Sequence, residues 1–88
     1  MKVDVQDYMK LVDRFVALAN ELKDEGTDPN TIANALMESS GIYATFVSAG
    51  NDGYLEPSGV DKMTDAFRQI LTRVQETKKA RAQTQQST

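Results

Sequence analysis

The 88-residue sequence contains no cysteine and no histidine. Without cysteine the chain has no disulfide, no thiolate nucleophile and no cysteine-bound zinc. Without histidine it lacks the commonest general base near neutral pH and the commonest transition-metal ligand. Catalysis would depend on carboxylate, Lys, Tyr or Ser side chains alone. We therefore predict that the protein is not an enzyme and that it has no catalytic residues, no cofactor and no metal.

Long apolar runs are also missing. No segment approaches the roughly 20 consecutive apolar residues that cross a bilayer. Asp4 and Asp7 interrupt the N-terminal segment before the apolar stretch of a secretory signal develops. We therefore expect a cytoplasmic protein with no membrane partner. The apolar fraction of 40% and the charged fraction of 26% are typical of a globular domain.

Helix signals divide the chain into three segments. Asp4 is the predicted N-cap of a helix over 5–23, and Gly26 is the predicted left-handed residue that ends it. Asp28 and Pro29 start a second helix over 29–49. A third helix is predicted over 58–80, with Ser58 as its N-cap. No segment has the pattern of a strand.

These segments predict an all-α fold, a helical bundle of three helices joined by short loops. Residues 1–81 form one domain in this interpretation. Residues 82–88 contain no large apolar side chain, and we expect them to be a disordered tail.

The second predicted helix is nearly free of charge. Between residues 29 and 50 only Glu38 is charged, and many of the other residues are small. A surface helix normally has a charged outer face, so this helix is expected to be covered on more than one side. Gly41 either permits close approach of another backbone or kinks the helix. We hypothesise that a symmetric homodimer buries the face formed by Ala33, Ser40, Gly41 and Ala44.

Three other features have functional and structural interpretations. Tyr54, in the turn after the second helix, is either folded over the core or an exposed anchor for a partner. Asp52-Gly53 matches the middle of a calcium-binding loop, but the flanking ligand positions are Ser48, Gly50 and Gly59, which favours a simple turn. A second acidic group at the first interhelical turn is either a cation site or a solvated helix end; it comprises Glu21, Asp24, Glu25 and Asp28.

The charge distribution bears on nucleic-acid binding. The net charge is −3, whereas residues 58–88 have six basic and three acidic side chains. Lys78, Lys79 and Arg81 favour the negative end of the third helix's dipole, and they are also the residues that would meet a phosphate backbone. Because the second helix has no Arg or Lys, a helix-turn-helix is excluded and a nucleic-acid partner is not expected.

Residues 39–51, Ser-Ser-Gly-Ile-Tyr-Ala-Thr-Phe-Val-Ser-Ala-Gly-Asn, resemble a bacterial family of short helical proteins known only as a domain of unknown function. Residues 15–21 and 65–71 are similar to that family's first and third helices. The resemblance covers about residues 8–75 and is least clear at Gly41 and over 50–57. It implies an all-α fold and no established activity or site.

The sequence thus favours a small interaction or adaptor module that binds a second copy or another protein. The alternatives are a nucleic-acid-associated regulator that uses the basic end of the third helix, and a protein that binds an ion or a small ligand. The absence of His and Cys argues against catalysis, and the uncharged second helix argues for binding.

Overall fold

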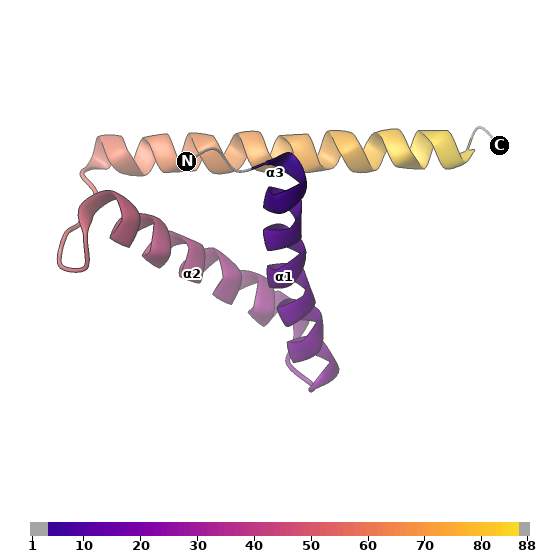
Figure 1. Cartoon of the computed structure of the whole chain (residues 1–88), viewed down its shortest axis with the longest axis horizontal. Helices are drawn as coiled ribbons and strands as arrows, with labels where there is room; N and C mark the ends of the chain where they lie inside the picture. Colours follow the sequence, from indigo (N-terminus) through magenta and orange to yellow (C-terminus); the bar gives the residue numbers. More distant parts are fainter. Residues whose placement is uncertain (1–3, 87–88) are drawn as a thin grey trace. The chain divides into compact units, whose positions relative to one another are not determined.

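A computed structural model describes residues 4–86 and places them in three α-helices. These are α1 (Val5–Asp24), α2 (Pro29–Ala49) and α3 (Pro57–Gln86), which follow one another from indigo to yellow in Figure 1. No strand occurs among residues 4–86, so the all-α prediction is confirmed for this part of the chain. None of the helices found there is long and apolar enough to cross a membrane.

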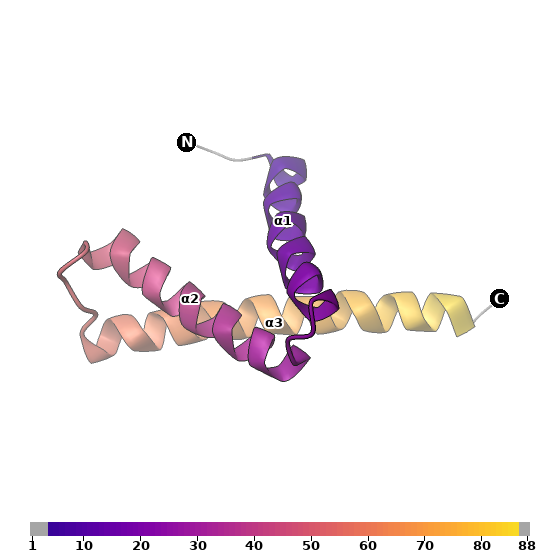
Figure 2. The same ribbon diagram turned by 90° about the horizontal axis from the view of Figure 1, so that it is seen from below.

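The chain divides into two compact units, Met1–Ala44 and Thr45–Thr88. The division falls inside α2, which is a continuous helical ribbon over its whole length in both views (Figures 1 and 2). The first unit contains α1 and most of α2, and the second contains the last turn of α2, the following loop and α3.

Both ends of α1 are capped as the sequence predicts. The Asp4 side chain accepts a hydrogen bond from the Gln6 backbone N–H at 3.2 Å. At the other end the Gly26 N–H donates to the Lys23 carbonyl at 3.0 Å, and the Thr27 N–H donates to the Leu22 carbonyl at 3.1 Å. This pair of bonds is a Schellman motif, which requires a left-handed residue after the C-cap. Gly26 has φ of +108° and supplies it.

The start of α2 follows the Asp28-Pro29 signal. The Thr31 backbone N–H donates to the Asp28 carboxylate at 3.1 Å, and the Ile32 N–H donates to the Asp28 carbonyl at 3.0 Å. Pro29, as the first helical residue, leaves no N–H unpaired. The helix therefore begins where its free amides find acceptors.

The loop after α2 is tightly folded against the helix end. Gly50 has φ of +81°, and the Gly53 N–H donates to the Gly50 carbonyl at 3.3 Å. A Cβ atom at Gly53 would overlap the Ala49 carbonyl oxygen, because the chain passes directly over the end of the helix there. Glycine at position 53 is thus required by close approach of the backbone, and not by an unusual φ.

The limits of α3 differ from the predicted range at both ends. The helix begins at Pro57, and the Glu56 carbonyl accepts from the N–H groups of Gly59 and Val60, so the N-cap prediction for Ser58 is wrong. Proline at the first helical position again explains the start. The helix then continues to Gln86, because Ala and Gln are good helix formers and neither Gly nor Pro stops it. Residues 82–86 are therefore helical where a disordered tail was expected, and 87–88 lie outside the described residues.

Very little of the described chain is buried. Ile32, in α2, is the only buried hydrophobic residue found among residues 4–85, at 7% exposure. Val12 and Ala19 in α1 are half-buried, as are Ala44, Leu55 and a few small residues near the loop. The three helices are thus formed by local capping and hydrogen bonding, with their apolar side chains mostly in contact with solvent.

Candidate interaction surface

Exposed apolar side chains occur on all three helices. Large hydrophobic residues with 38% or more of their surface accessible include Val5, Tyr8, Phe15 and Leu18 in α1, Met37, Ile42 and Tyr43 in α2, and Val60, Met63, Phe67 and Ile70 in α3. Single exposed hydrophobic residues are normal on soluble proteins, whereas repeated ones along a helix face mark a surface that another element covers. The helices therefore present candidate contact faces.

The face predicted on α2 is accessible over most of its length. Ala33 and Ser40 are exposed, and Ala44 is half-buried. At 100° per residue these three side chains lie within about 40° of one another around the helix. Met37 lies in the same strip and is 53% exposed. Spacing of three and four residues from Ala33 and Ser40 would have identified Met37 from the sequence, but the interpretation considered only small residues.

Gly41 lies at the edge of this α2 strip. A Cβ atom built at Gly41 meets no heavy atom within 4 Å outside the backbone of its own helix turn, so there is space for a side chain at this position. Because α2 is helical on both sides of Gly41, the glycine does not interrupt the helix. A second chain would therefore find room for close approach at Gly41.

Tyr54 is the most exposed large hydrophobic residue in the described chain, at 76%. Its neighbour Leu55 is half-buried and faces α3, where its Cβ stands 3.3 Å from the position that a Cβ would occupy at Gly59. The loop therefore buries Leu55 and leaves the Tyr54 ring outside. Tyr54 is therefore exposed and not folded over the core, while its role as an anchor for a partner stays a prediction.

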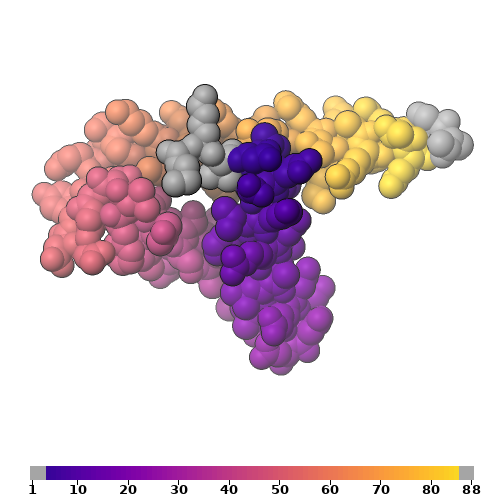
Figure 3. Space-filling model, in the orientation of Figure 1, coloured from indigo at the N-terminus to yellow at the C-terminus, as the bar shows by residue number. Residues whose placement is uncertain are grey.

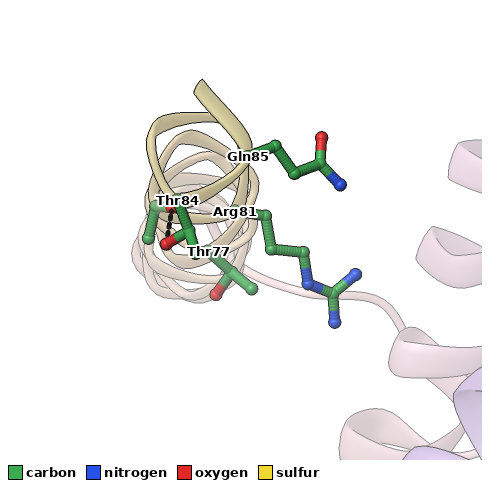
Figure 4. Close-up of a pocket in the computed structure, with 5 residues that line it drawn as sticks. Thr77, Arg81, Thr84 and Gln85 are labelled. Carbon is green, nitrogen blue, oxygen red and sulfur yellow. Dashed lines mark hydrogen bonds between the residues drawn. The ribbon is translucent and has the colours of Figure 1, made fainter. Parts of the chain in front are cut away.

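The C-terminal part of α3, which is yellow in Figure 3, has a shallow hollow. The hollow is lined by Thr77, Ala80, Arg81, Thr84 and Gln85, all on α3 and all exposed. In Figure 4 the side chains of Arg81 and Gln85 extend from the same side of the helix, and the Thr84 hydroxyl donates to the Ala80 carbonyl at 2.9 Å. A hollow walled by one helix encloses no small ligand, since binding pockets bury most of their ligand's surface.

Acidic side chains do not converge on a cation site in the part of the chain that the structure describes. No group of three or more His, Cys, Asp or Glu side chains there is placed to hold a metal ion. Asp28, from the acidic group at the first turn, caps α2 instead. At the second turn, Gly53 serves the close approach to Ala49.

Comparison of the chain with protein-family models, curated proteins and solved structures finds no match.

Proposed function

We propose that this protein is a non-enzymatic interaction module that buries its apolar helix faces against a second copy of itself. The observation that supports the proposal most is burial. One hydrophobic residue, Ile32, is buried among residues 4–85, while large apolar side chains on every helix expose 38% or more of their surface. We also propose that the chain belongs to the bacterial family of unknown function that residues 39–51 resemble. That family has no established activity, so membership is compatible with such a module.

Burial of apolar surface is the main favourable contribution to folding, and a domain of this size has little to spare. Net stabilities are only about 5–15 kcal/mol, against an entropy cost that reaches on the order of 100 kcal/mol. A single buried isoleucine does not meet that cost. The remaining apolar burial must come from contacts that form when the helices associate.

The α2 strip of Ala33, Met37, Ser40 and Ala44 is the proposed contact surface in the dimer. It carries no charge, so it is desolvated at low cost, and its small side chains let a second backbone approach closely. A symmetric dimer uses the same patch on both copies. Tyr54 is the proposed aromatic anchor at a separate point of the surface, because interfaces draw much of their affinity from exposed Tyr residues.

The test is molar mass by light scattering on a size-exclusion peak at tens of micromolar protein, compared with the chain mass of 9.7 kDa. We expect twice that mass for the unmodified chain, and a lower mass for Ala33→Lys and Gly41→Lys, which place a charge on or beside the strip. Ala35→Lys is the matched control, because Ala35 is exposed on the opposite side of α2. A monomeric unmodified chain would refute the proposal, as would equal losses in Ala33→Lys and Ala35→Lys.

Gel shifts with duplex and single-stranded nucleic acid address the main alternative. Lys78, Lys79 and Arg81 are exposed and would supply the phosphate contacts. We expect no shift at low salt. A shift that weakens steeply with salt, and that is lost in Lys78→Gln/Lys79→Gln, would favour the nucleic-acid-associated regulator over the interaction module.

A further inference from the structure

One face of α3 has a repeat that continues beyond its apolar residues. Residues on this face recur with spacings of three and four in strict alternation: Val60, Met63, Phe67, Ile70, Val74, Thr77, Arg81 and Thr84. An average spacing of 3.5 residues is the signature of a coiled-coil seam, in which alternate positions are called a and d. We call this set the α3 seam. Its five apolar members are 40–50% exposed, so they are available for a partner.

The length of the α3 seam narrows the choice of partner. From Val60 to Thr84 it covers 25 residues, or about 37 Å at 1.5 Å per residue. The apolar stripe of α1 has similar spacing but covers only residues 5–22, or about 27 Å. At 20 and 21 residues, α1 and α2 are both shorter than the seam, so among the helices that the structure describes only α3 matches its length.

Charge selects the direction of such a pair. In a parallel pair Arg81, at an a position, would face Arg81 of the partner subunit. Arg73 and Lys78 flank the seam at g and e positions, which meet across a parallel pair, so these two basic side chains would also be opposed. Like charges in contact across a helix pair disfavour that pairing. In an antiparallel pair none of these basic side chains lies opposite another.

The register follows from pairing a positions with d positions in the antiparallel direction. Placing Phe67 opposite Ile70 of the partner subunit also pairs Met63 with Val74 and Val60 with Thr77. In this register Arg81 is level with Glu56 of the partner subunit, and both side chains are exposed. Sliding one helix by seven residues, so that each helix meets its partner nearer the C-terminal end, would instead put Arg81 opposite Met63 of the partner subunit. The first register therefore combines apolar pairing with charge complementarity.

We propose that α3 associates with α3 of a second copy as an antiparallel pair in the Phe67–Ile70 register, with Arg81 paired to Glu56 at each end. The proposal rests on the proposed self-association and adds to the α2 strip a second contact surface, on α3, together with its direction and register. A twofold axis that passes midway between Phe67 and Ile70 relates the two helices, as a symmetric dimer requires.

Engineered disulfides test the direction directly, because the chain has no cysteine of its own. Val60→Cys and Thr77→Cys are prepared separately, mixed so that subunits exchange, mildly oxidised and resolved on a non-reducing denaturing gel. We expect covalent dimers for about half of the chains in the mixture, the statistical share of mixed dimers. Neither variant alone should cross-link, because identical residues would lie about 25 Å apart and a disulfide needs Cα atoms within about 7 Å.

Thr72→Cys is the matched control, because Thr72 lies on the side of α3 opposite the seam and should not cross-link. Cross-linking of Val60→Cys and Thr77→Cys each by itself would show a parallel pair and overturn the proposal. The absence of a cross-link in the mixture would also overturn the proposal. It would mean that the α3 seam packs against another part of its own chain or stays exposed to solvent. If that sample still had twice the chain mass, self-association would stand while the α3 pairing failed.

A charge exchange tests the register independently. Arg81→Glu should weaken dimerisation by about two- to fivefold for each of the two symmetric pairs, the usual range for exposed ion pairs. Adding Glu56→Arg to the same chain should restore the original dissociation constant, measured by sedimentation equilibrium. If the double variant is as weak as the sum of its two single changes, the proposed contact between these residues is wrong.

Discussion

The close approach of the loop to the end of α2 makes Gly53→Ala a strong test of the local structure. An added Cβ would overlap the Ala49 carbonyl oxygen and stand 2.8 Å from the carbonyl carbon and 2.9 Å from the Ala49 Cβ. These atoms belong to the backbone or lie directly on it, so they cannot rotate away. The loop would have to lift off the helix end, with loss of the Gly53–Gly50 hydrogen bond.

Overpacking of this kind costs about 1–3 kcal/mol of unfolding free energy. For a chain of 60–100 residues each kcal/mol lowers the melting temperature by roughly 4–8 °C. We therefore expect Gly53→Ala to melt about 5–20 °C below the unmodified protein. The measurement is the helical circular-dichroism signal against temperature at fixed protein concentration.

Two further glycine substitutions provide graded controls. Gly41→Ala places its Cβ in open space on α2 and should gain about 0.5–1 kcal/mol from helix propensity, measured at the same fixed protein concentration. Gly59→Ala would stand 3.3 Å from the Leu55 Cβ, so crowding should offset most of the propensity gain. The reasoning is refuted if Gly53→Ala is as stable as the unmodified protein, or if Gly41→Ala loses as much stability as Gly53→Ala.

Three other substitutions separate capping, burial and binding. Asp28→Ala should cost about 1 kcal/mol, because the Thr31 N–H loses its acceptor, and Asp28→Asn should retain most of the stability in the same thermal melt. Ile32→Ala should cost about 2–5 kcal/mol in urea unfolding, since Ile32 is buried within its own chain. Tyr54→Ala should leave the helical circular-dichroism signal unchanged, because the ring is exposed, yet raise the dimer dissociation constant in sedimentation equilibrium; unchanged dimerisation would remove Tyr54 from the contact surface.

Helix ends were largely predictable from the sequence because capping is local. Asp4, Gly26 and Asp28 act where the pattern placed them, through hydrogen bonds to residues no more than three positions away or through a positive φ. The start of α3 was misassigned by one residue because Ser58 and Pro57 are both favourable start signals. Its end was misassigned because lack of apolar residues indicates an uncovered helix as readily as a disordered segment.

The candidate surface was less predictable, because exposure depends on contacts between distant residues. Phe67 and Ile70 recur with the helical spacing that is typical of core residues, yet both are more than 40% exposed. The exposed position of Tyr54 was left open because it depends on which of two adjacent loop residues turns inward. Sequence alone does not decide that choice, whereas the contact between Leu55 and Gly59 does.

The spacing of apolar residues that α1 and α3 share indicates the geometry with which each helix packs, but it does not identify the partner helix. Both have apolar residues at intervals of three and four, so each is suited to a helix that crosses it at a small angle. Identical periods make the two helices, or two copies of either, equally acceptable as partners on pattern alone. Length and charge distinguish between these partners, because the α3 seam extends through Thr77, Arg81 and Thr84, where the chain is polar and basic. A seam that continues into charged residues needs a partner with acids at the matching level, and antiparallel pairing brings Glu56 there.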